Sequence, residues 1–139
     1  DEDTTFKIQK SYQVDQPFGS DITPPSDLLF PFSPETEYDS YITIPYKEED
    51  QNLASLSSIG IDFDQWTEDT DLVTDPILGG AIFAMDPRVE NNKKNGKLFV
   101  GQLTIGENES VDTQFNIQGK MKDGTTAQIT GISFNYTPE

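Results

Sequence analysis

Acidic side chains crowd one stretch of the sequence, and carboxylates are the groups in this chain best suited to chemistry. Residues 62–75 read DFDQWTEDTDLVTD. In extended backbone, alternate side chains share a face, so the first two aspartates point the same way. Calcium takes about six to eight oxygen ligands from carboxylates, carbonyls and water. A loop that folds back on itself could offer four carboxylates to one calcium ion: Asp62, Asp64, Asp69 and Asp71.

This spacing is not that of an EF-hand. Counting from Asp62, the position that needs glycine is Thr67, and the position that needs a bidentate glutamate is Val73. The alternative interpretation is an acidic loop that stays solvated and keeps the protein soluble. Calcium is the one cofactor for which the sequence holds candidate ligands.

Trp66 stands inside the acidic stretch and is the only tryptophan of the chain. An exposed indole beside Tyr41 or Tyr46 could form a stacking surface for a sugar ring. A lone tryptophan in a β protein also serves as a large core residue. Trp66 and Tyr41 are therefore candidate ligand-binding residues, with burial in the core as the alternative.

Most catalytic chemistry is excluded by composition. The chain has no histidine and no cysteine, and Arg88 is its single arginine. Imidazole bases, thiol nucleophiles and zinc–thiolate sites are therefore absent. Paired carboxylates for glycoside hydrolysis remain, but no spacing singles out a pair and one small domain offers a poor cleft. We expect no enzyme activity.

The charge is strongly negative and unevenly distributed. The net charge is −16, with 25 acidic and 9 basic residues in 139, and the excess of acid lies before residue 91. Such a field repels phosphate backbones and anionic lipid, so we expect neither a nucleic acid partner nor membrane insertion. A cationic protein is compatible with it. The lack of cysteine fits either a reducing compartment or a bacterial-type exported protein. Because the first residue is not methionine, we expect an exported mature chain.

Three apolar runs near the end of the chain predict antiparallel strands at residues 97–105, 111–119 and 126–136. Between the last two, Asp123 and Gly124 form the strongest short hairpin signal. In the middle run, apolar residues alternate with polar ones. We predict one buried core that contains Phe115, Ile117, Ile132 and Phe134.

Four earlier runs also predict strands, and the chain shows no helical stripe. They cover residues 5–14, 39–46, 56–63 and 78–85. Seven strands in 139 residues predict a single all-β domain, an antiparallel two-sheet sandwich with Greek-key, immunoglobulin-like or cohesin-like connections. A closed barrel is the alternative.

A proline-rich segment, residues 15–34, separates the first two predicted strands. Proline lacks the amide hydrogen, so this segment does not fit a ladder. It holds four clustered apolar residues that need a partner: Leu28, Leu29, Phe30 and Phe32. We interpret it either as a loop laid over one end of the core or as an arm that docks on another subunit. If the strands from Asp39 onward hold most of the core, a chain lacking residues 1–34 folds but no longer assembles.

Several short motifs occur in a recognisable order. They are YDSYITI from Tyr38, IGIDF from Ile59, Asp86-Pro87, GQLTI from Gly101, and NIQGK from Asn116 followed by Asp123-Gly124. In that order they resemble an uncharacterised exported β-domain family of marine bacteria and algae, over about residues 38–125. The resemblance implies an exported β-domain and no particular activity.

These observations lead to one expected function and two alternatives. We expect a non-enzymatic structural or accessory subunit of a larger extracellular or organellar assembly, which acts through protein–protein contacts or self-assembly. The second class is a calcium- or carbohydrate-binding module with a glycan partner. The third is a carboxylate-based glycoside hydrolase.

Overall fold

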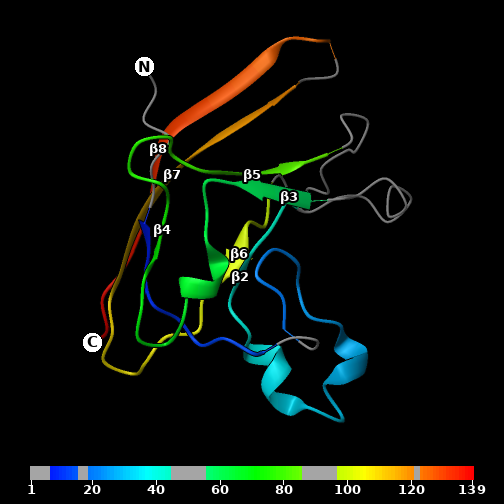
Figure 1. The fold of residues 1–139 in the computed structure, drawn as a ribbon, viewed down its shortest axis with the longest axis vertical. Helices are drawn as coiled ribbons and strands as arrows, with labels where there is room; N and C mark the ends of the chain where they lie inside the picture. The colour runs from blue at the N-terminus through cyan, green and yellow to red at the C-terminus, as the bar shows by residue number, and fades with distance from the viewer. Residues whose placement is uncertain (1–6, 16–18, 45–55, 86–96, 121–122) are drawn as a thin grey trace.

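The computed structural model describes residues 7–15, 19–44, 56–85, 97–120 and 123–139 (Figure 1). Over these ranges strands predominate, and the helical part consists of short 3-10 turns. The strands are β1 (Lys7–Ile8), β2 (Tyr41–Ile42), β3 (Leu56–Ile59), β4 (Leu72–Val73), β5 (Ala81–Ala84), β6 (Gly101–Gln102), β7 (Val111–Lys120) and β8 (Thr126–Tyr136); the turns are η1 (Asp27–Leu29), η2 (Pro34–Tyr38) and η4 (Phe63–Gln65). The prediction of an all-β chain is confirmed.

Every strand pair in the described ranges is antiparallel. β1 pairs with β4, β2 with β6, β3 with β5 and β7 with β8. Each described sheet is therefore a two-stranded pair, whereas the sequence predicted two broader sheets. Only β7 and β8 are consecutive, so the other pairs close longer loops.

The predicted strands are present, but most are shorter than expected. For example, the predicted run at residues 97–105 contains only β6. The Thr104 amide donates 2.9 Å to the Ser40 hydroxyl, and the Tyr12 amide donates 2.8 Å to the Thr104 carbonyl. Because a side chain replaces a backbone partner here, the regular ladder ends while its hydrogen bonds are still satisfied. One strand, β4, lies inside the stretch expected to be an acidic loop.

The β7–β8 hairpin agrees with its predicted alternation. Along β7, Val111 and Thr113 are buried, Phe115 and Ile117 are half-buried, and the intervening residues are exposed. The register shifts between Phe115 and Ile117, opposite Gly131, which has φ +68°. This bulge keeps the apolar residues of β8 facing those of β7 on both sides of the shift.

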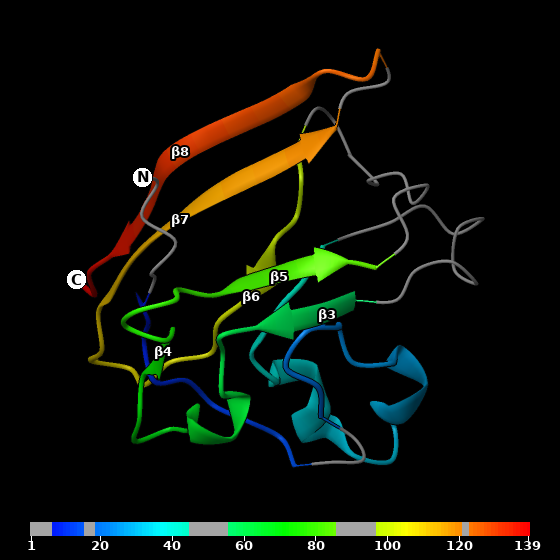
Figure 2. The same cartoon turned by 45° about the horizontal axis from the view of Figure 1, so that its top comes forward.

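The hydrophobic core lies elsewhere, and the predicted core is wrong in part. Phe134 is 53% exposed, and Phe115, Ile117 and Ile132 are only half-buried. We call the part of the molecule formed by β1–β6 and the 3-10 turns the body. The β7–β8 hairpin extends beyond the body, away from η1 and η2, so the body covers only part of the apolar face of the hairpin (Figures 1 and 2). The buried core instead joins Ile8, Trp66 and Leu72, with these residues packed against it: Ile42, Ile61, Phe63 and Leu103.

Most of the core residues follow Asp39, as expected, but Ile8 contributes to the core from β1. Ile8 is 9% exposed and pairs with Leu72 across β1 and β4. The carbonyl of the next residue, Gln9, accepts the indole hydrogen of Trp66 at 3.0 Å. A chain lacking residues 1–34 would lose these contacts, so the removal of residues 1–34 tests folding as well as assembly.

Candidate functional site

The proline-rich segment folds locally into turns over its described part. In η1, the Ser26 hydroxyl accepts from the Leu28 amide, and the Phe30 amide donates to the Asp27 carbonyl at 3.2 Å. The Phe32 and Ser33 amides both donate to the Leu29 carbonyl, at 3.0 and 2.8 Å. The chain from Ser26 to Ser33 is therefore held by its own hydrogen bonds, and it is not extended.

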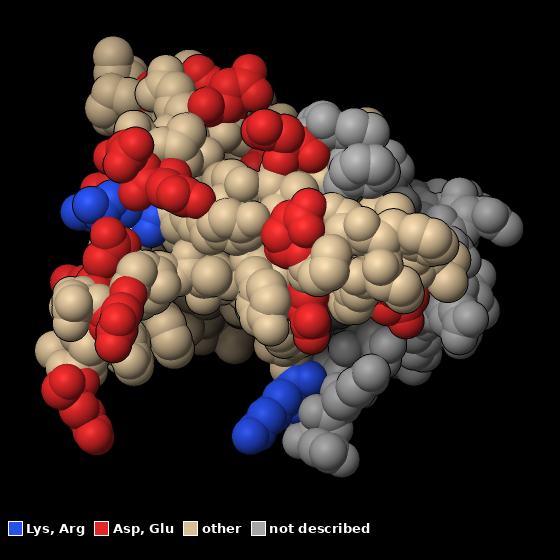
Figure 3. Space-filling model, turned by 90° about the horizontal axis from the view of Figure 1, so that it is seen from below, with Lys and Arg blue, Asp and Glu red and all other residues tan. Residues whose placement is uncertain are grey.

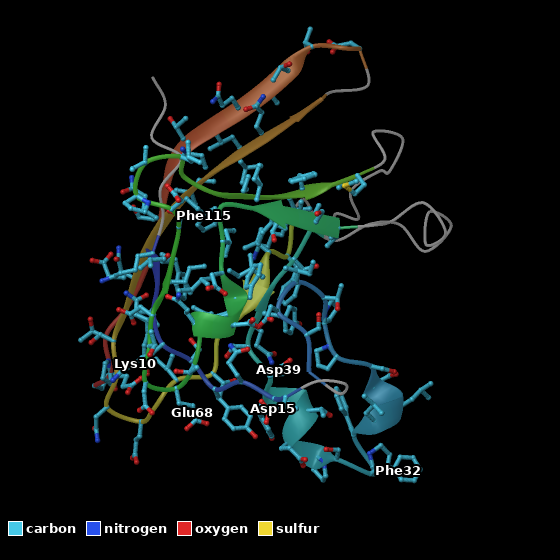
Figure 4. The ribbon with its side chains drawn as sticks, in the orientation of Figure 1. Lys10, Asp15, Phe32, Asp39, Glu68 and Phe115 are labelled. Atoms are coloured by element: carbon cyan, nitrogen blue, oxygen red, sulfur yellow. The ribbon has the colours of Figure 1, made fainter. Side chains whose placement is uncertain are left out.

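The four apolar residues of this segment divide into two pairs. Leu28 is 78% exposed and Phe32 is 87% exposed, whereas Leu29 and Phe30 are half-buried. Phe32 points away from the rest of the chain at one end of the molecule (Figure 4). We name Leu28 and Phe32 the apolar knob. The knob is the part of the predicted arm that is free to meet another molecule.

A buried carboxylate fastens the beginning of the segment to the body. Asp39 is fully buried, and its two oxygens accept the amides of Val14 and Ser20, each at 2.9 Å. Nearby, the Ile42 amide donates to the Asp21 carbonyl at 2.9 Å. Figure 4 shows Asp39 between η2 and η4, in the body of the molecule. Because each of its oxygens accepts a hydrogen bond from a backbone amide, Asp39 acts as a structural clamp.

The side chain of Asp21 shares this environment. Burial, together with smaller contributions from the charges of Asp39 and Asp64, raises the pKa of Asp21 to about 6. Burial also raises the pKa of Asp39, although the hydrogen bonds from Val14 and Ser20 oppose that shift. The site therefore contains a carboxyl group that gains or loses its proton close to neutral pH.

Sequence reasoning missed the role of Asp39, although a signal was present. Asp39, Tyr41 and Thr43 are all buried, and they alternate at the spacing of one strand face. Ser40 between them is buried as well, and no faces were assigned within the predicted strand at residues 39–46. An aspartate on an inner face requires hydrogen-bond donors, and a clamp satisfies that requirement.

The four candidate calcium ligands have separate roles in the structure. The Asp62 carboxylate caps η4 and accepts from the Asp64 amide at 3.2 Å, and Asp69 is exposed. Asp71 accepts from the Lys10 amide at 2.7 Å and lies 4.0 Å from the Lys7 ammonium. Over the described ranges, no cluster of three or more candidate ligands is suited to a metal ion. The calcium hypothesis stays a prediction, without an assembled ligand set to support it.

The two candidate sugar-binding aromatic residues are both buried. Trp66 is 2% exposed within the core, and Tyr41 packs against Phe99 with ring centroids 6.2 Å apart. Burial raises the pKa of the Tyr41 hydroxyl, and the charge of Asp39 adds to that effect. Neither ring offers a face to a sugar in this conformation, which accords with the core alternative for Trp66.

The outer surface carries the acidic character of the sequence. Acidic side chains are spread over the face shown in Figure 3, with only a few basic ones among them. Two ion pairs are formed within the described ranges, between Lys7 and Asp71 and between Lys10 and Glu109. None of the helices described has the length and apolar character needed to cross a membrane.

The comparisons with known proteins returned no relative. No protein-family model, curated protein or solved structure matches the chain. The resemblance to exported β-domains over residues 38–125 therefore stays a prediction.

Proposed function

We propose that the chain is a non-enzymatic binding subunit of a larger assembly and that the apolar knob, Leu28 and Phe32, contacts a partner protein. The observation that supports this function is the combination of high exposure and fixed backbone at the knob. Single exposed apolar residues are common, but Leu28 and Phe32 belong to a run of four clustered apolar residues and are the two of them that the chain leaves exposed.

The turn lowers the entropy that binding would cost. The main-chain bonds at Leu29 and the Ser26 cap hold the knob in one arrangement before any partner arrives. A segment that is already ordered loses less conformational freedom on docking than a flexible one. The Asp39 clamp fastens the same segment at Val14 and Ser20, before the knob.

Charge next to the knob indicates the chemistry of the partner. Asp27 lies in η1, and Glu35 and Glu37 lie in η2, all exposed. The Ser33 hydroxyl donates to the Glu35 carboxylate and lowers the pKa of Glu35, which favours its charged form. A complementary partner surface has an apolar pocket with basic residues at its rim.

Three further features belong to this proposal. The first is the predicted architecture, in which the antiparallel pairs belong to the two sheets of a sandwich. The second is that the assembly is extracellular or lies in an organelle lumen, as expected for an exported chain. The chain performs no catalysis.

The test compares two matched serine substitutions in the native source extract. Phe32→Ser removes the knob, and Ile77→Ser removes an equally exposed residue, 90% exposed, from a different turn. We expect the unmodified chain and Ile77→Ser to retain the same protein, which elutes at about 0.5 M salt because screening weakens charge attraction. Phe32→Ser should lose it, with an unchanged melting temperature.

A photo-reactive phenylalanine analogue at position 32 supplies the second measurement. We expect it to cross-link the retained protein, while the same group at position 77 does not. Equal retention by all three chains, or equal cross-linking from both positions, would overturn the proposed role of the knob.

A further inference from the structure

The outer edge of β8 is the second surface with an unexplained property. β8 is eleven residues long, and β7 is its one partner among the described strands. An edge strand presents a row of amide and carbonyl groups to any strand that approaches. Natural monomers protect such edges with lysine, proline, bulges or short length. β8 has a bulge at Gly131, but the Ile132–Tyr136 part beyond it contains no charged residue and no proline.

The apolar face of the hairpin is incomplete in the single chain. Ile129, Phe134 and Tyr136 lie on that face, and each remains about half exposed. A two-stranded hairpin is marginally stable alone in water, and three or more strands with a shared apolar face are needed for independent stability. An additional strand beside β8 would extend the face and cover these side chains.

We propose that the Ile132–Tyr136 part of β8 pairs with the same segment of a second copy of this chain, antiparallel about a twofold axis, to give the sheet order β7–β8–β8–β7. This surface lies at the opposite end of the molecule from the apolar knob (Figure 1), and the proposal does not depend on the function proposed for the knob.

Charge favours a second copy at this edge. Each chain carries a net charge of −16, so most approaches between copies are repulsive. The uncharged β8 is where two acidic chains meet with the least repulsion. A cationic partner, in contrast, would be attracted to the acidic surface elsewhere and would gain nothing from an uncharged strand.

The other edge of the hairpin explains why pairing stops at two copies. On β7, the Asp112 carbonyl accepts from the Gln9 side chain at 2.8 Å, and the Thr113 hydroxyl donates to the Lys7 carbonyl at 2.6 Å. These contacts cover the start of β7 with the β1 segment. A twofold pair through β8 therefore closes and leaves no equivalent edge for a third copy.

The test compares two variants, each of which carries one added positive charge, on β8 in one variant and on β7 in the other. Ser133 on β8 and Gln114 on β7 are directly paired and both exposed, so Ser133→Lys and Gln114→Lys make the same change one strand apart. In the proposed dimer, the lysines at 133 are close to their symmetry copies, whereas those at 114 lie on the outer strands. Like charges across a strand pair are destabilising.

The measurement is sedimentation velocity of the whole chain over a range of concentrations. We expect a dimer that tightens between about 0.05 M and 0.5 M salt, because screening reduces the repulsion between copies. Ser133→Lys should weaken it by about fivefold, while Gln114→Lys stays within about twofold of the unmodified chain. Both variants should keep the melting temperature of the diluted, monomeric chain.

Single cysteines at the same two positions give an independent readout, since the chain has no cysteine of its own. The two outer strands of a four-stranded sheet are three strand spacings apart, about 14 Å. A thiol cross-linker shorter than this distance should join two Ser133→Cys chains and should not join two Gln114→Cys chains. A chain that stays monomeric at high salt, a dimer that Ser133→Lys does not weaken, or equal cross-linking at both positions would overturn the proposal.

Discussion

The body of the molecule and the β7–β8 hairpin differ in how order is achieved. In the body, the strands are two to four residues long, yet Trp66, Leu72 and Asp39 are almost completely buried. In the hairpin, the strands are ten and eleven residues long, yet Phe134 and its neighbours remain exposed. Regular strand pairing and burial therefore contribute separately to the order of the chain. The body depends on burial together with hydrogen bonds between side chains and backbone.

The largest expected effect contrasts one aromatic residue from each region. Trp66→Ala should lower the free energy of unfolding by about 3–5 kcal/mol, because it leaves a cavity and removes the indole hydrogen bond to Gln9. Phe134→Ala should lower it by less than about 1 kcal/mol in dilute solution, because the ring is half exposed. Chemical denaturation of both variants measures the difference. Similar losses would mean that the hairpin face is buried in the folded monomer.

The hairpin was the easier region to predict from the sequence. Its alternation is local, and Asp123-Gly124 marks the turn, so the pattern alone fixes which side chains face inward. Even so, the sequence could not reveal that the inner face is incompletely covered, because cover depends on how far the body extends. Phe134 was misplaced for that reason.

The body could be predicted only as a set of short strands. Its order depends on contacts between distant residues, such as the Trp66 indole with Gln9 and the Thr104 amide with Ser40. No local pattern encodes these bonds. The two-residue strand β4 is likewise too short to show a period, and a single tryptophan gave no basis to choose between core and surface.

A second contrast uses glycines with positive φ in each region. At Gly60, φ is +71°, and an added Cβ would lie 1.9 Å from the Gly79 carbonyl oxygen. At Gly124, φ is +87°, and nothing lies within 4 Å of an added Cβ. Gly60→Ala combines backbone strain with a clash and should cost about 2–4 kcal/mol, whereas Gly124→Ala carries the strain alone, about 1–2 kcal/mol. Thermal unfolding compares them, and equal costs would show that the backbone at Gly60 moves aside.

The Asp39 clamp should contribute an intermediate amount. Asp39→Ala removes the acceptor of the Val14 and Ser20 amides and should lower the free energy of unfolding by about 1–3 kcal/mol. Removal of a buried charge offsets part of this loss. Native-state hydrogen exchange provides the specific readout, because exchange at these two amides should accelerate more than exchange in β7. An exposed carboxylate on the hairpin supplies the control, Asp112→Ala, which should leave both amides protected. Unchanged exchange in Asp39→Ala would show that the clamp does not hold the segment.

The smallest expected effect is a dependence of stability on pH that arises in the body. The pKa of Asp21 is raised from 3.8 to about 6 in the folded chain, mainly by burial, so between these values the folded state holds a proton that the unfolded state has released. Stability from this group is therefore complete below about pH 4 and is lost as the pH rises through 6. The raised pKa of Asp39 acts in the same direction.

Two other carboxylates limit the gain in stability at lower pH. Hydrogen bonds from the Leu78 and Ile77 amides lower the pKa of Asp75, and Thr125 lowers that of Asp123. The stability that these groups contribute is present above their unfolded values near 4 and is lost as the pH falls further. We therefore expect the melting temperature to rise from pH 7.5 to about pH 5 and to fall again below about pH 4. Asp21→Asn should raise the melting temperature at pH 7.5 and flatten the rise, while Asp112→Asn on the hairpin keeps the full profile. If Asp21→Asn retains the rise in full, the pH dependence does not come from Asp21, and the body and the hairpin do not differ in this respect.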